Sequence, residues 1–229
     1  HSFPTRRSSD LPTATYSISG TIDLNGVGQP DVIVALTGTA TNAAITAADG
    51  TYSFNGLPNG SYTVTPWPGS YNFLGTSRAV TINNANANQV DFYNRWLNNF
   101  NGTVTDRSTG RVWLKKVDCE GGKWWLAGQT WAAGLADGSC GLSDGSAAGD
   151  WRMATIDELL AVGNGEEPVR AGTPRIFENV TNFLYWSTTL EPPGDDPNYV
   201  LSFGMQDGDS RPSRITTVVQ LVWPVRAGQ

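Results

Sequence analysis

The chain has 229 residues and a formal net charge of −6, a length that corresponds to one or two domains. No segment reaches the roughly 18 consecutive apolar residues of a membrane-spanning helix. From Pro12 onward there are 13 basic and 20 acidic residues, with no basic stripe of the kind that binds nucleic acid or an anionic membrane.

The first eleven residues are set apart from the rest of the chain. His1–Leu11 matches the in-frame translation of a short-read sequencing adapter, so we exclude it from the fold; a natural disordered arm is the alternative. The native N-terminus is then expected to be missing, and a signal peptide is not observable. The chain's only histidine, His1, lies in this segment, so the genuine protein segment is expected to contain none.

The next part of the chain, from Tyr16 to Tyr93, alternates apolar and polar residues in six short segments. Turn sequences such as Asn25-Gly26 and Asp49-Gly50 separate them. Short strands with this punctuation predict a β-sandwich. The predicted strands are Tyr16–Ile22, Asp31–Leu36, Thr51–Phe54, Gly60–Thr65, Arg78–Ile82 and Gln89–Tyr93.

One segment in this part is more specific. Ala48–Val64 (Ala-Asp-Gly-Thr-Tyr-Ser-Phe-Asn-Gly-Leu-Pro-Asn-Gly-Ser-Tyr-Thr-Val) resembles the carboxypeptidase-regulatory-like and SdrD/CnaB-type B-domains, which are prealbumin-like β-sandwiches. The resemblance implies that residues 12–94 form a spacer domain of a surface protein. A ligand contact by Trp67, which lies between two prolines, is the alternative. Asn83–Gln89 is predicted to be a polar turn, and Asn94–Asn99 a short linker.

The second half predicts a small α+β arrangement. Gly102–Leu114 has the pattern of a hairpin, and Gln129–Leu135 that of a short helix. Thr155 and Glu158 form a capping box at the start of a second helix, which Gly163 ends. The strands expected after it are Leu184–Thr189, Tyr199–Phe203 and Val218–Arg226.

Four tryptophans mark this half in a fixed order. Trp113 follows a Thr-Gly-Arg-Val turn, Trp151 lies in Gly-Asp-Trp-Arg, Trp186 in Tyr-Trp-Ser-Thr-Thr and Trp223 in Leu-Val-Trp-Pro-Val-Arg. These motifs resemble the Lcl C-terminal domain (DUF1566) family from about Asn101 to the end of the chain. The resemblance implies a C-type-lectin-like α+β domain over residues 95–229, in a bacterial protein that is secreted or displayed on the cell surface.

The two cysteines bear on the compartment. Cys119 and Cys140 are expected to form a disulfide, because the rest of the chain is typical of a secreted protein; two buried thiols are the alternative. Closing a loop of this size is worth about 3 kcal/mol in the chain-entropy model. Without histidine, two cysteines do not complete a tetrahedral metal site, and they have no partner for Cys-His catalysis.

The acidic residues do not form a catalytic pattern. Carboxylates occur as neighbours at Asp157/Glu158, Glu166/Glu167 and Asp195/Asp196. Neighbouring side chains on a helix or strand point apart, so none of these pairs suits acid–base catalysis. We therefore predict a protein that is not an enzyme and needs no cofactor. Calcium at one of two oxygen-rich loops, Asp144–Asp150 or Glu191–Asn198, is the alternative.

A ligand is expected at two polar loops, Leu190–Asn198 and Gly204–Arg214, because rigid scaffolds usually place recognition on loops. Trp124 and Trp125 are expected nearby. If they lie on a strand, neighbours face opposite sides and one indole is exposed; both indoles packed under the loops is the alternative. The predicted contacts are Trp124, Trp125, Asp195, Asp196, Asn198, Asp207, Asp209, Arg211 and Arg214.

Together these patterns predict a mainly β chain with a small α+β part, a β-sandwich followed by a lectin-like domain. The expected function is non-enzymatic adhesion or recognition of a glycan or of an extracellular matrix or surface protein, without nucleic acid or membrane insertion. From Arg95 onward 12 basic residues face 16 acidic ones, which disfavours a polyanion unless Arg175, Arg211 and Arg214 cluster. A structural part of a surface assembly and a retroelement-diversified receptor remain as alternatives.

Overall fold

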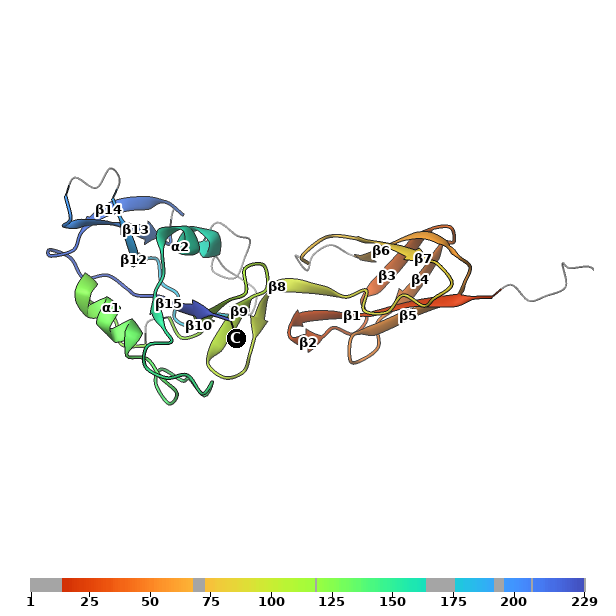
Figure 1. Cartoon of the computed structure of the whole chain (residues 1–229), viewed down its shortest axis with the longest axis horizontal. Helices are drawn as coiled ribbons and strands as arrows, with labels where there is room; N and C mark the ends of the chain where they lie inside the picture. The colour runs from red at the N-terminus through yellow and green to blue at the C-terminus, as the bar shows by residue number, and fades with distance from the viewer. Residues whose placement is uncertain are drawn as a thin grey trace, which may run out of the picture. The chain divides into compact units, whose positions relative to one another are not determined.

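The computed structural model describes residues 14–67, 73–117, 119–163, 176–191, 196–206 and 208–228. The adapter-like segment His1–Leu11 lies outside the described residues. The chain divides into two compact units, His1–Asn94 and Arg95–Gln229 (Figure 1). No helix among the described residues is both long enough and apolar enough to cross a membrane.

The first unit is built from strands alone in its described part. One sheet has the order β4-β3-β6-β7, and a second contains β1 with β2 and β5 beside it. Figure 1 shows the two sheets as facing layers. The strands are β1 (Tyr16–Asn25), β2 (Val27–Gly28), β3 (Ile33–Gly38), β4 (Asn42–Ile45), β5 (Thr51–Leu57), β6 (Gly60–Trp67), β7 (Arg78–Ile82) and β8 (Phe92–Asn98).

The alternation seen in the sequence decides which side chains fill the space between these sheets. Val34 and Leu36 of β3 are fully buried, and they meet Ile18 of β1 and Phe54 of β5 in one apolar cluster. Successive side chains on a strand point to opposite faces, so the residues between them face outward. The β-sandwich prediction is therefore confirmed.

The predicted linker is wrong. Asn94–Asn99 falls largely on β8, which begins in the first unit and pairs with β9 through Trp96, Leu97 and Asn98 in the second. Trp96 is buried in the core of the second unit, where its ring meets the Phe177 ring edge-on at 5.2 Å. Backbone pairing with β9, the next strand along the chain, overrides the polar composition of this segment. The short strands β2 and β4 were not predicted.

The second unit contains two sheets and two short helices in its described part. One sheet has the order β11-β15-β10-β9 and continues into the end of β8, and the other has the order β12-β13-β14. The elements are β9 (Thr103–Asp106), β10 (Arg111–Leu114), α1 (Trp125–Ala133), β11 (Arg152–Met153), α2 (Ile156–Gly163), β12 (Leu184–Leu190), β13 (Tyr199–Gly204), β14 (Ser210–Arg214) and β15 (Pro224–Ala227).

Helix α2 begins as predicted, and Gly163 is its last described residue. The Thr155 backbone N–H donates to Glu158 Oε2 at 2.9 Å, and the Glu158 N–H donates to Thr155 Oγ1 at 3.3 Å. This reciprocal pair satisfies two N–H groups at the helix start that have no intrahelical acceptor. Glu158 also accepts from Arg152 Nη1 at 2.8 Å and from Arg111 Nε at 3.1 Å. The capping box therefore also ties α2 to β10 and β11.

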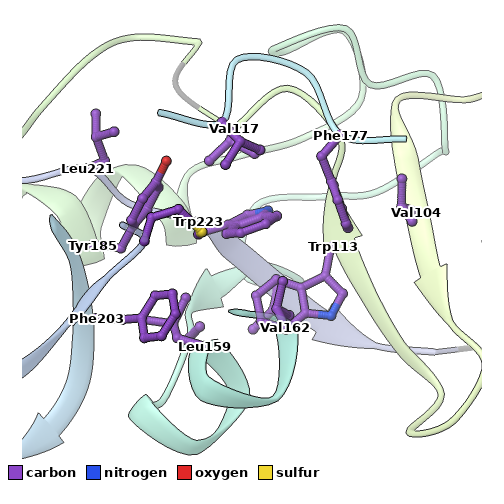
Figure 2. Close-up of a cluster of buried hydrophobic side chains, with 14 of the residues drawn as sticks. Val104, Trp113, Val117, Leu159, Val162, Phe177, Tyr185, Phe203, Leu221 and Trp223 are labelled. Carbon is purple, nitrogen blue, oxygen red and sulfur yellow. The ribbon is translucent and has the colours of Figure 1, made fainter. Parts of the chain in front are cut away.

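The core of the second unit gathers around Trp223, as Figure 2 shows. Its ring meets Trp113 at 5.4 Å and Phe177 at 4.8 Å in edge-on geometry, with Tyr185 at 5.9 Å. Its indole N–H donates to the Leu114 carbonyl oxygen at 3.1 Å. Large aromatic rings supply much of the burial of a small domain, which explains why the tryptophans occupy core positions.

The disulfide is present and lies beside a second aromatic cluster. Cys119 and Cys140 are bonded, with their Cα atoms 5.6 Å apart. Both pack against the cluster that contains the fully buried Trp151. The Trp151 indole N–H donates to Ser146 Oγ at 3.0 Å, and the Arg226 guanidinium stacks on its ring at 5.3 Å. The cross-link and these polar contacts hold the long loop between α1 and β11.

Candidate functional site

The site is built around the segment that connects β14 to β15. Gln220 and Lys123 exchange backbone hydrogen bonds of 2.8 and 3.1 Å. On the other side, Leu221 accepts from the Trp186 N–H at 2.9 Å and donates to the Leu184 carbonyl oxygen at 3.1 Å. The segment thus lies between Lys123 and β12 and extends the β12-β13-β14 sheet.

Gly122 allows this segment to approach closely. A Cβ at Gly122 would lie 2.8 Å from Val219 Cγ1, closer than real side-chain contacts come. The Trp186 indole N–H donates to the Lys123 carbonyl oxygen at 2.8 Å, which anchors the neighbouring residue against β12. Glycine at this position therefore sets the position of the exposed valine beside it.

A pocket of about 550 Å³ opens beside this segment. This volume lies within the range of small-ligand and side-chain binding pockets. Most of its walls are apolar. The lining residues that the structure describes are Gly122, Phe183, Leu184, Pro212, Ser213, Arg214, Val218, Val219, Gln220 and Leu221.

Two features of the pocket favour binding. Phe183 is 68% exposed and Val219 50% exposed, so two large apolar side chains stand in solvent at its rim. Arg214 is the single charged residue among its described lining.

The structure divides the predicted contact residues between two ends of one hairpin. At one end, Asp196 Oδ1 accepts from the Asn198 backbone N–H at 2.9 Å. Arg214 lies at the same end, opposite Tyr199 in the register of β13 and β14. Hydrogen bonds from Asn198 lower the pKa of Asp196, and the charge of Arg214 adds to the shift. Asp209 lies at the opposite end, four strand positions and thus about 13 Å away.

The loop predicted at Gly204–Arg214 is wrong over its second part. Ser210–Arg214 forms β14 and pairs with β13, with Arg211 opposite Ser202. Its polar sequence with Pro212 conceals a strand, because an edge strand tolerates proline and exposed side chains. Asp195, Asp207 and Arg175 lie outside the described residues.

The two neighbouring indoles are separated, but not by a strand. Trp125 is the first residue of α1 and Trp124 its N-cap, so the predicted strand is wrong. The Trp125 indole N–H donates to the Ser187 carbonyl oxygen at 2.8 Å, and Trp124 is 49% exposed. Trp124 is therefore exposed because a helix begins between the two residues, and not because of a strand.

The two aspartates proposed for calcium have other partners. Asp144 Oδ2 accepts from Arg226 Nη2 at 3.0 Å, and Asp144 Oδ1 accepts from Ser146 Oγ at 2.7 Å. Asp150 Oδ2 accepts from the Ala147 N–H at 2.8 Å. Burial raises the pKa of Asp144, and the bonds from Ser146 and Arg226 outweigh it, so the net shift is downward. Across the described ranges, no three acidic, cysteine or histidine side chains form a metal-binding group.

The sequence interpretation missed most of the pocket lining. Val218 was placed inside a strand, yet both Val218 and Val219 are exposed, at 39% and 50%. Two neighbouring valines on a strand would face opposite sides, one of them buried. Only the pairing of this segment with Lys123 and β12 reveals that both side chains reach solvent.

The second unit is thus a disulfide-linked α+β domain with an apolar pocket on its smaller sheet. Residues 102–226 match the Lcl C-terminal domain family. The match covers more than half of the chain, and the chain therefore belongs to this family. The resemblance inferred from the tryptophan motifs is confirmed, whereas the B-domain resemblance of Ala48–Val64 stays a prediction.

Comparison with solved structures gives distant likenesses. The Bacillus anthracis TIE protein is 12% identical over 36% of this chain and 17% of its own, with a TM-score of 0.30. GBS52, the minor pilin of Streptococcus agalactiae, is 13% identical over 35% of this chain and 44% of its own, with a TM-score of 0.28. The group B streptococcus pilus 2b backbone protein is 15% identical over 34% and 41%, with a TM-score of 0.27.

The matched part of this chain spans between 17% and 44% of these three structures. We infer no function from likenesses at this level of similarity. No curated protein matches the sequence.

Proposed function

We propose that this protein is a non-enzymatic recognition protein of the bacterial surface or exterior, and that its second unit binds a matrix or surface protein at the pocket beside Val218–Leu221. The observation that carries the proposal is the apolar pocket with Arg214 at its wall and exposed Phe183 at its rim. Protein hot spots typically insert an apolar or aromatic anchor into such a pocket, with polar groups around it.

The disulfide between Cys119 and Cys140 supports the compartment, because such bonds persist in oxidising surroundings. The partners of the buried carboxylates support a role without catalysis. Asp106, Asp144 and Glu158 each accept hydrogen bonds from an arginine, which keeps them ionised and structural. Reproducible turnover of any substrate by the purified chain would contradict this part of the proposal.

The test is a binding screen of the full chain on immobilised extracellular matrix proteins and glycans, each with calcium and with a chelator. Phe183→Ala and Arg214→Ala are expected to weaken binding at least tenfold, because they remove the anchor contact and the charge at the pocket. Leu126→Ala is the matched control, since Leu126 is 69% exposed but does not line the pocket.

The outcomes distinguish the pocket from other binding surfaces of the second unit. Binding that survives both pocket variants but is lost in Trp124→Ala would move the contact to the start of α1 and refute the pocket assignment. Binding that requires calcium would point instead to the acidic loops. Absence of binding to every immobilised probe would contradict recognition and favour a structural role in a surface assembly.

A further inference from the structure

A second exposed surface lies on the first unit, far along the sequence from the pocket. Ile33 of β3 pairs directly with Ile45 of β4 on one side and with Trp67 of β6 on the other. Paired residues on neighbouring strands place their side chains on the same face. Ile33 is 43% exposed, Ile45 65% and Trp67 62%. The row Ile45-Ile33-Trp67 therefore stands in solvent on the outer face of the sheet.

The outward strand positions around this row carry no charge, and Asp31, just before β3, is the nearest charged residue in the sequence. Residues that alternate with the buried positions on β3, β4 and β6 are small, hydroxylated or apolar. Arg78 of β7 pairs with the buried Val64 and therefore lies on the opposite face. The outward positions of the three strands are Ile33, Ala35, Thr37, Ala43, Ile45, Ser61, Thr63, Thr65 and Trp67.

The whole segment has few charged residues, and most of them are acidic. Residues 12–94 contain one basic and four acidic residues and no lysine. Asp91 accepts from the Thr21 N–H at 2.8 Å on β1, and Asp23 accepts from the Gly26 N–H at 3.1 Å in the β1–β2 turn. A polyanion would find no cation on this face, and exposed Asp31 close to Ile33 would repel it.

The size of the row also limits what binds there. The three side chains expose on the order of 300 Å² of mostly apolar surface. A stable dimer buries roughly 600 Å² or more on each partner, so the row alone is too small for a second copy of the chain. It spans two strand spacings, about 10 Å, which suits a narrow, extended ligand lying across the strands.

We propose that this face binds a neutral polysaccharide. The indole of Trp67 offers a flat apolar platform for the C–H face of a sugar ring, and Ile33 and Ile45 continue that platform across the next two strands. Thr63 and Thr65 on the same face supply hydroxyl groups for hydrogen bonds to sugar hydroxyls. An uncharged ligand with alternating apolar faces and hydroxyl edges matches an uncharged surface of the same character. This site is independent of the pocket in the second unit.

Native affinity electrophoresis of the full chain tests the proposal, with hydroxyethyl cellulose, soluble β-glucan or soluble starch in the gel. At least one neutral polysaccharide is expected to retard the chain, and Trp67→Ala to raise the dissociation constant at least tenfold. Ile33→Ser is expected to give a smaller rise. Because Trp67 is mostly exposed, the Trp67→Ala variant should fold like the parent. Its unfolding transition should be unchanged, and its near-UV circular dichroism should differ only by the signal of the lost indole.

Phe100→Ala is the matched control, since it removes an exposed aromatic ring from the second unit and should leave retardation unchanged. Two results would overturn the proposal: no retardation of the parent chain by any of the three polysaccharides, or retardation of Trp67→Ala equal to that of the parent. A dimer in light scattering that Trp67→Ala dissociates, without retardation by polysaccharide, would identify a second copy as the occupant instead.

Discussion

The buried ion pair between Arg95 and Asp106 gives the sharpest stability prediction. Asp106, at the end of β9, is 1% exposed and accepts from Arg95 Nε at 2.8 Å, with a second bond from Nη2. Ser108 adds bonds to the same carboxylate from its N–H at 2.9 Å and its Oγ at 2.6 Å. The guanidinium stacks on Trp96 at 4.5 Å, so one carboxylate holds both the hairpin turn and the start of the second unit.

Asp106→Ala removes both carboxylate acceptors and leaves Arg95 mostly buried without its counter-ion, although Arg95 Nη1 still donates to the Ala161 carbonyl oxygen at 2.8 Å. Breaking a buried pair in this way costs about 3–5 kcal/mol. Because the Arg95 side chain keeps 20% exposure, we expect the lower part of that range, about 3 kcal/mol. For a unit of this size that lowers Tm by about 10 °C. Asp106→Asn preserves volume and should lose about 1–2 kcal/mol.

The same contacts set a pH dependence. Burial raises the pKa of Asp106, but the hydrogen bonds from Arg95 and Ser108 outweigh it and hold the pKa below its ordinary value of 3.8. A carboxyl whose folded pKa is depressed contributes stability above its unfolded pKa and loses it as the pH falls through the folded value. Stability should therefore fall as the pH drops below about 4, and less steeply in Asp106→Asn.

Urea unfolding followed by tryptophan fluorescence between pH 2 and pH 7 measures both effects. Asp157→Asn is the control, an exposed aspartate in the same unit that should change stability by less than about 0.5 kcal/mol. If Asp106→Ala unfolds within 1 kcal/mol of the parent, or if its acid slope equals that of the parent, the pair does not stabilise the fold as argued.

Two further predictions concern the second unit. Replacing Cys119 and Cys140 by serine together should destabilise this unit by about 3 kcal/mol and leave the first unit's calorimetric transition in place; an unchanged second transition would contradict the role of the cross-link. Glu158→Ala should cost about 1–2 kcal/mol in chemical denaturation, mainly through the lost cap on Thr155, because its two arginine partners are substantially exposed. Glu158→Gln keeps an acceptor for the Thr155 N–H and should recover most of that loss. If Glu158→Gln and Glu158→Ala lose the same stability, the effect comes from the charge of Glu158 and not from the cap.

Local sequence patterns predicted much of the fold. The alternation over Arg78–Ile82 gave a strand with the bounds observed, and Thr155 with Glu158 marked the start of α2. The tryptophan motifs led to the correct family, because their order survives in the core around Trp223. These features depend on neighbours within a few residues or on side chains too large to be placed outside a core.

The candidate site was largely hidden from the sequence. The residues predicted to meet a ligand, such as Asp196 and Asp209, lie at opposite ends of one hairpin. The polar sequence of β14 indicated a loop, because the backbone pairing with β13 that makes it a strand is not encoded in side-chain polarity. Trp124 and Trp125 were considered for a strand, whereas a helix begins there.

The amino-acid sequence by itself determined the mainly β character, the disulfide pair and the family, since composition, alternation and large aromatic residues act locally. Tertiary structure alone decided where function is proposed. The pocket exists because the segment Val218–Leu221 pairs with both Lys123 and β12. The exposed row Ile45-Ile33-Trp67 exists because the register of three strands aligns these side chains. Strand register and pairing partner are set by packing across the whole unit, and a shift of one residue would turn these side chains to the opposite face.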